Sequence, residues 1–125
     1  MKNLKFRAWD KQECEFVPYL RNIVLKHDGT IEGIEYEMPH EGIVYNDISY
    51  FELLQSTGLK DKNGVEIYEG DIVKNERNEL GNIKWSRGAF AYCDGISNYH
   101  LFSIGSGKTF EVVGNIYQHL HLLEE

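Results

Sequence analysis

The sequence predicts a mainly β protein made of short antiparallel strands. Two observations carry this prediction: apolar residues alternate with polar ones in many short runs, and turn residues separate these runs at short intervals. The first run shows the period of two, because Leu4, Phe6 and Ala8 alternate with more polar residues. A chain of 125 residues suffices for one hydrophobic core, so we expect a single compact domain over residues 1–125.

Residues 1–54 are predicted to form an amino-terminal β part. A strand covers the first alternating run, and five further strand candidates follow, with turn signals such as Asp28-Gly29 between them: residues 15–19, 23–26, 31–36, 42–45 and 50–57. Acidic residues gather around Pro39, which is typical of a solvated loop. We therefore expect no ligand at this acidic stretch.

Residues 55–125 are predicted to form a barrel-like part. Glycine-containing turns become denser here, and short strand candidates lie between them: residues 65–68, 72–74, 81–85, 89–93, 99–104 and 109–113. A tight turn feeding a strand that pairs with the next one is similar to small SH3-like barrels, so we expect such a barrel with the amino-terminal strands added to it. Ile116, Leu120 and Leu123 have helical spacing behind a cap at Asn115, which predicts one short carboxyl-terminal helix.

The composition excludes several classes of protein. Thirteen basic and twenty acidic residues give a net charge of −7, which disfavours non-specific binding to nucleic acid. No apolar run approaches the roughly 18 residues of a membrane span, so we expect no membrane partner and a cytoplasmic location. Cys14 and Cys93 belong to no paired motif, and we expect two reduced, largely buried thiols.

Two glycine-containing motifs resemble ligand sites without matching them. Residues 105–109, Gly-Ser-Gly-Lys-Thr, look like the end of a phosphate-binding loop, but Phe102 stands where the first glycine is required. Residues 61–66 look like part of a calcium loop, but the glycine and glutamate stand at the wrong places. Both segments are interpreted as hairpin turns, the second one at Asn63-Gly64.

Clusters of titratable residues give no catalytic or metal site. Four carboxylates lie within eleven residues, and their turn positions favour a solvated surface: Asp61, Glu66, Glu69 and Asp71. His119 and His121 would point apart on a helix, so no zinc site is expected there. The sequence therefore predicts no catalytic residue, no metal and no cofactor, and we expect that the protein is not an enzyme.

One set of aromatic and basic residues is a candidate interaction surface. Arg7 and Trp9 share the outer face of the first predicted strand, and Lys84, Trp85 and Arg87 cluster near the end of a predicted hairpin. These residue types can form a stacking platform for bases. A core or interface anchor is the simpler interpretation of a tryptophan in a small β protein.

Several segments resemble the YopX family of bacteriophage and prophage proteins. They are residues 5–10, residues 55–64 continuing through 67–73, the later Gly81, Trp85, Gly88 and Phe90, and residues 112–117. The resemblance spans both ends of the chain. It implies a small, predominantly β protein that is encoded by a phage or prophage and acts inside a bacterium, and it implies no particular activity, cofactor or catalytic residue.

The sequence leaves three functional hypotheses. The first is a non-catalytic interaction or assembly module that binds an unidentified host or phage protein or forms a homo-oligomer. The alternative is a small-barrel nucleic-acid-binding protein that uses Arg7, Trp9, Lys84, Trp85 and Arg87. A second alternative is an enzyme with an unrecognised site. Residues 58–73 are interpreted as scaffold in all three, because two tight reversals fix hairpin register while Ile67, Ile72 and Val73 fill the core.

Overall fold

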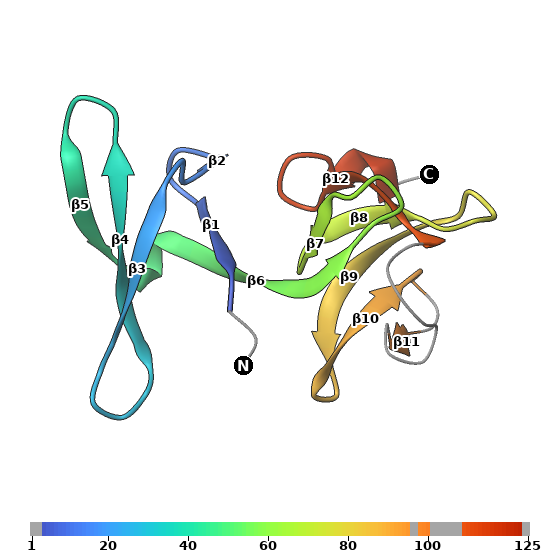
Figure 1. Cartoon of the computed structure of the whole chain (residues 1–125), viewed down its shortest axis with the longest axis horizontal. Helices are drawn as coiled ribbons and strands as arrows, with labels where there is room; N and C mark the ends of the chain where they lie inside the picture. The colour runs from blue at the N-terminus through green and yellow to red at the C-terminus, as the bar shows by residue number, and fades with distance from the viewer. Residues whose placement is uncertain (1–3, 96–97, 101–108, 124–125) are drawn as a thin grey trace. The chain divides into compact units, whose positions relative to one another are not determined.

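The computed structural model describes residues 4–95, 98–100 and 109–123. The fold is mainly β, with antiparallel sheets and a half-barrel, as the sequence predicts. The chain divides into two compact units (Figure 1). The first unit is Phe6–Leu54, and the second combines Met1–Lys5 with Gln55–Glu125.

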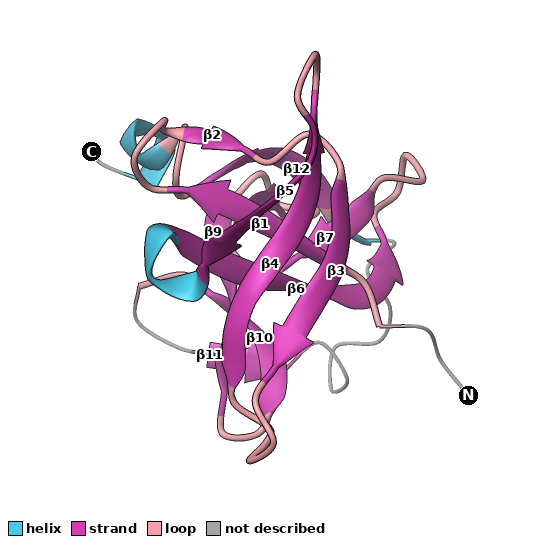
Figure 2. Cartoon of the chain, turned by 90° about the vertical axis from the view of Figure 1, so that its left-hand side faces the viewer, coloured by secondary structure: helices cyan, strands magenta, loops and turns pink. Residues whose placement is uncertain are grey.

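The first unit contains two groups of hydrogen-bonded strands. Its elements are β1 (Phe6–Asp10), β2 (Glu15–Phe16), β3 (Leu20–Leu25), β4 (Ile31–Met38), β5 (Gly42–Asp47), the 3₁₀ turn η1 (Ile48–Tyr50) and the start of β6 (Phe51–Lys60). β1 lies between β2 and β6, and β4 lies between β3 and β5. Figure 2 shows the long antiparallel strands β3, β4 and β5 side by side.

The core of this unit follows the period of two along β4. Ile34 and Tyr36 are buried, together with Ala8 of β1 and Phe51 of β6. The Tyr36 and Phe51 rings meet edge to face, with 5.7 Å between their centroids. The intervening Glu35 and Glu37 are only half-buried and engage polar groups of β3. The alternation that predicted the strand therefore also decides which face packs inward.

The second unit is built on a five-stranded antiparallel sheet. Its elements are the rest of β6, then β7 (Glu66–Tyr68), β8 (Asp71–Lys74), β9 (Leu80–Ser86), β10 (Ala89–Cys93), β11 (Asn98–His100) and β12 (Glu111–Asn115). The order in the sheet is β11-β10-β9-β8-β12, and β7 pairs with β6. The buried core consists of Ile67, Val73, Ile83, Tyr92 and Phe110. The predicted strands are thus confirmed, although residues 101–104 of one candidate lie outside the described part.

The predicted carboxyl-terminal helix is not formed as expected. Asn115 ends β12, and its side-chain oxygen accepts hydrogen bonds from the N–H groups of Tyr117 and Gln118, so the predicted cap is present. The chain then makes one turn, closed by the His119 N–H on the Asn115 carbonyl, and continues as the short 3₁₀ turn η3 (Leu120–Leu123). So short an apolar stripe cannot offset the cost of nucleating a longer helix. None of the helical segments in the described residues is long and apolar enough to cross a membrane.

The motif at residues 58–73 is a structural device, as interpreted from the sequence. Ile67, Ile72 and Val73 are completely buried. The expectation that the carboxylates face water is wrong for two of them, because Asp61 and Asp71 are also buried. Asp71 accepts a hydrogen bond from the Tyr68 N–H at 2.8 Å across the tight turn between β7 and β8.

Asp61 ties the turn after β6 to β12. One carboxylate oxygen accepts hydrogen bonds from the N–H groups of Asn63 and Val65, both at 2.8 Å, and the other accepts from Val112 at 2.9 Å. Burial alone would raise the pKa of this carboxyl, but the three N–H donors outweigh burial, and the pKa lies below its ordinary value. The oxygens that suggested a calcium ligand are therefore used by the backbone of this chain.

The two thiols differ in exposure. Cys14 is exposed in the turn between β1 and β2, where its φ is +56°, whereas Cys93 is half-buried. Both are free, as expected, but the expectation of burial is wrong for Cys14. Of the phosphate-loop-like segment, residues 105–108 lie outside the described part of the chain, and Thr109 is exposed.

We expect Asp61→Ala to lower the free energy of unfolding by about 3 kcal/mol, because it leaves three backbone N–H groups without their charged acceptor. Urea unfolding followed by tryptophan fluorescence measures this loss. The control is Asp28→Ala, which removes a cap on Thr30 from the exposed turn between β3 and β4 and should cost much less. Equal losses would show that Asp61 is an ordinary turn cap.

The free energy of unfolding should fall as the pH drops below about 4. The folded-state pKa values of Asp61 and Glu66 are depressed, so the unfolded chain takes up these protons at a higher pH than the folded chain. The stabilisation is present above the unfolded-state pKa and is lost as the pH falls through the folded-state values. Urea unfolding at a series of pH values should give a shallower acid limb for Asp61→Asn than for the wild type. Parallel curves would contradict the assignment.

Candidate functional site

The five residues of the predicted interaction surface are divided between the two units. Arg7 and Trp9 belong to the unit Phe6–Leu54, and Lys84, Trp85 and Arg87 belong to the other unit. Each group is therefore considered within its own unit.

Trp9 packs in the core of its unit. Only 7% of its surface is exposed, and its ring meets Phe16 edge to face at a centroid distance of 5.0 Å. The Arg7 guanidinium lies 4.6 Å from the centre of the same Phe16 ring, which is a cation–π contact. The pair is thus held by Phe16 across the β1–β2 ladder and leaves no open tryptophan face for a base.

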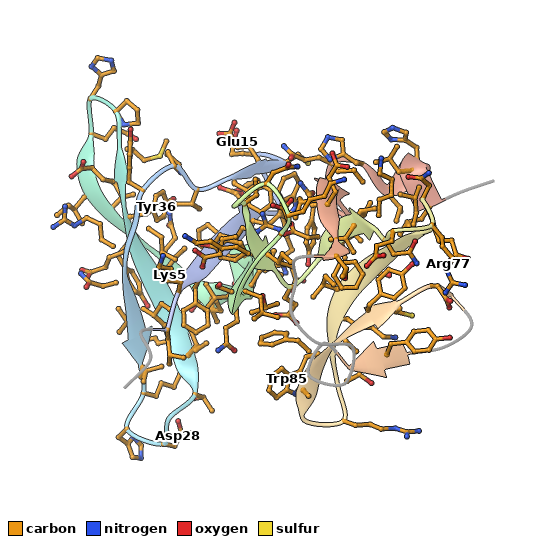
Figure 3. All side chains as sticks on the ribbon, turned by 45° about the vertical axis from the view of Figure 1, so that its right-hand side comes forward. Lys5, Glu15, Asp28, Tyr36, Arg77 and Trp85 are labelled. Carbon is orange, nitrogen blue, oxygen red and sulfur yellow. The ribbon has the colours of Figure 1, made fainter. Side chains whose placement is uncertain are left out.

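Lys84, Trp85 and Arg87 remain exposed at the hairpin of β9 and β10, as Figure 3 shows for Trp85. Trp85 exposes 54% of its surface and lies opposite Phe90 in the strand register. Their rings meet edge to face at 4.9 Å, which fixes the indole. Arg87 and Gly88 have φ values of +52° and +81°, as a tight two-residue hairpin requires. We call Lys84, Trp85, Arg87 and Phe90 the hairpin patch.

A hollow of about 320 Å³ borders the hairpin patch at Phe90. Lys5 and Glu66 form an ion pair at its wall, with 3.1 Å between nitrogen and oxygen. Glu66 also accepts a hydrogen bond from the Ser56 hydroxyl, and this bond, followed by Lys5, lowers the pKa of the glutamate although burial opposes the shift. The charges at this wall are therefore used to hold β7 to β6.

A larger hollow of about 590 Å³ in the second unit has an aromatic floor. The Tyr92 and Phe110 rings are stacked at a centroid distance of 5.2 Å, and Tyr99 lies at 6.4 Å from Tyr92. The Tyr92 hydroxyl donates to the Glu79 carbonyl at 3.3 Å. Burial, followed by nearby acidic groups, raises the pKa of Tyr92, so the hydroxyl stays a donor.

The first unit has an acidic groove of about 630 Å³ that sequence reasoning did not find. The described residues that line it include four carboxylates and no lysine or arginine: Asp10, Gln12, Glu13, Glu15, Phe16, Val17, Pro18, Tyr36, Met38, Glu41, Val44, Tyr45 and Asn46. They come from the turn between β1 and β2 and from the hairpin of β4 and β5. In the sequence these segments are more than twenty residues apart, so only the acidic residues around each turn could have been a signal.

Most of the net negative charge lies on the first unit. Phe6–Leu54 carries four basic and ten acidic residues, a net charge of −6, whereas the second unit carries nine basic and ten acidic residues, a net charge of −1. The acidic residues predicted to form a solvated loop belong largely to the strand β4. The structure therefore converts a modest overall imbalance into one strongly acidic unit.

Tyr45 reports this negative field at one side of the groove. Its hydroxyl donates to Glu32 at 2.8 Å, and its ring crosses the backbone at Gly33, where a Cβ atom would lie 2.5 Å from the hydroxyl oxygen. The hydrogen bond to Glu32, with burial and the charges of Glu32, Asp47 and Glu35, raises the pKa of Tyr45 to about 12. Tyr45 is therefore a neutral donor at physiological pH.

The described residues contain no group of three or more histidine, cysteine, aspartate or glutamate side chains that could hold a metal ion. Of the four clustered carboxylates, Asp61 and Asp71 serve the backbone, Glu66 serves β6, and Glu69 lies 3.4 Å from the Gln55 N–H. His119 accepts a hydrogen bond from the Asn115 N–H at 3.2 Å, and its ring lies 6.3 Å from that of His121.

The comparisons with known proteins agree with the resemblance seen in the sequence. The model of the YopX protein family matches residues 5–124. A solved structure of protein EF1440 from Enterococcus faecalis is 28% identical, with a TM-score of 0.70 over 99% of this chain and 100% of that chain. YopX from Bacillus subtilis is 19% identical and shares the fold, with a TM-score of 0.68 over 100% of this chain and 98% of that one.

Comparison with curated proteins gives no match. The family model nevertheless covers nearly the whole chain, including both units. The chain belongs to the YopX protein family.

Proposed function

We propose that this protein is a non-catalytic interaction or assembly module, encoded by a phage or prophage and acting in the cytoplasm of a bacterial host. Its partner is a host or phage protein, or a second copy in a homo-oligomer. The observation that carries the proposal is Trp85, which exposes 54% of its surface while Phe90 holds its ring in place.

The hairpin patch has the properties of an interface anchor. Tryptophan and arginine are enriched among the residues that dominate binding energy at protein interfaces. The edge-to-face contact with Phe90 and the tight turn at Arg87 and Gly88 fix the indole before binding, which reduces the entropy lost on association. Lys84 and Arg87 add polar contacts at the rim.

The alternative function is binding of nucleic acid by a small SH3-like barrel. The observation that favours it is the pair of exposed basic residues, Lys84 and Arg87, beside the exposed Trp85. The buried Trp9 no longer contributes to such a platform. This alternative predicts binding that weakens steeply with salt concentration and depends on nucleic acid in the sample.

Affinity purification from bacterial cells carrying the tagged chain, with and without nuclease, tests the proposal. We expect proteins that remain bound after nuclease treatment and that are lost by at least fivefold with Trp85→Ala, because truncation of an interface anchor costs more than about 1 kcal/mol. Tyr19→Ala is the control, since Tyr19 is exposed to 63% but lies in the other unit.

Three further results decide between the hypotheses. Circular dichroism should show the same melting curve for Trp85→Ala and the wild type, because the residue is exposed. Loss of all bound material with nuclease would favour the nucleic-acid alternative. Light scattering that shows a monomer, together with no protein retained after nuclease treatment, would reject the proposal.

A further inference from the structure

The acidic groove combines an apolar floor with a charged rim. Phe16, Val17, Met38 and Val44 contribute apolar surface, and the buried Tyr36 lies beneath them with its hydroxyl accepting from the Asn46 amide at 2.7 Å. Carboxylates surround this floor, and Figure 3 labels Glu15 on the rim and Tyr36 on β4. Long basic side chains have the matching construction, because their aliphatic stems pack on apolar surface while the charged ends reach carboxylates.

Three of the rim carboxylates are available to a ligand. Asp10 already accepts the N–H groups of Gln12 and Glu13 through one oxygen. Glu13, Glu15 and Glu41 are exposed, and within the described residues none of them forms a salt bridge. A cation entering the groove therefore does not have to displace a basic side chain of this unit.

The basic residues of the unit are engaged elsewhere. Arg7 lies on Phe16, Arg21 pairs with Glu37 at 3.4 Å, and Lys11 lies 4.0 Å from Glu52. The net charge of −6 on this unit attracts positively charged partners over a distance and repels polyanions. A second copy of the chain, with a net charge of −7, is disfavoured for the same reason.

We propose that the acidic groove between the β1–β2 turn and the β4–β5 hairpin binds an arginine- and lysine-rich segment of a protein partner. The inference rests on the proposed function and names the chemistry of one partner. Arginine stems lie along Val17 and Met38, and guanidinium groups pair with Glu15 and Glu41 at the rim. Phe16 already holds the guanidinium of Arg7, which shows that this aromatic surface accepts that group.

A fluorescent peptide of alternating arginine and glycine is the probe, with a glutamate and glycine peptide as its negative control. We expect saturable binding of the arginine peptide to the full chain, with amide chemical-shift changes at groove residues. The double variant Glu15→Gln with Glu41→Gln should weaken binding about tenfold, because it removes two charges at the rim. Increasing salt should weaken binding to the wild type more than to this variant.

The matched control is Glu35→Gln with Glu37→Gln, which removes the same charge from the same unit outside the groove. Binding should change less than twofold. Equal weakening by the two double variants would show that only the net charge matters and would overturn the groove assignment. Absence of peptide binding, or shift changes confined to other residues, would overturn it as well.

Two other occupants of the groove give distinct results. Self-association that is lost in the Glu15 and Glu41 variant would replace the proposed partner by a second copy. Saturable binding of a single-stranded oligonucleotide that shifts groove residues would replace it by nucleic acid. If groove binding fails while Trp85-dependent protein capture persists, only this inference is wrong; if capture fails while groove binding persists, the hairpin patch is not the anchor.

Discussion

The carboxylate of Asp61 is the constraint on which the second unit depends. It satisfies three backbone N–H groups at once, two in its own turn and one in β12, fifty-one residues later in the chain. The neighbouring Lys62 N–H donates to the Phe110 carbonyl at 2.9 Å, so the same turn carries a second link to this region. Phe110 in turn stacks on Tyr92 in the core. A local turn motif thereby fixes the position of a strand that is remote in sequence.

The strands were predictable because their signal is local, whereas the burial of the carboxylates was not. A period of two and glycine-rich turns identify β4 or β10 without knowledge of neighbours. Asp61 and Asp71 stand beside glycines and therefore look like exposed turn residues, and only the packing of β12 and β7 around them reveals that they are buried. The carboxyl-terminal helix was wrong because its cap was real but its apolar stripe was too short.

The candidate site was predictable only in part for the same reason. The hairpin patch follows from a two-residue turn with Trp85 and Phe90 in register, which are local features. The acidic groove joins a turn near Glu15 to a hairpin near Glu41, and nothing in either segment predicts that they meet. Division of the sequence into equal halves also hides the acidic character of the first unit, since Lys5 belongs to the second unit.

The exposed cysteine in the β1–β2 turn has a practical consequence. Cys14 stands between Glu13 and Glu15, two residues that line the groove, and the other thiol, Cys93, is half-buried in the other unit. A maleimide dye applied briefly to the native protein will react faster with Cys14. The wild-type chain therefore offers an attachment point for a fluorophore or a photo-crosslinker next to the groove, without the introduction of any new residue.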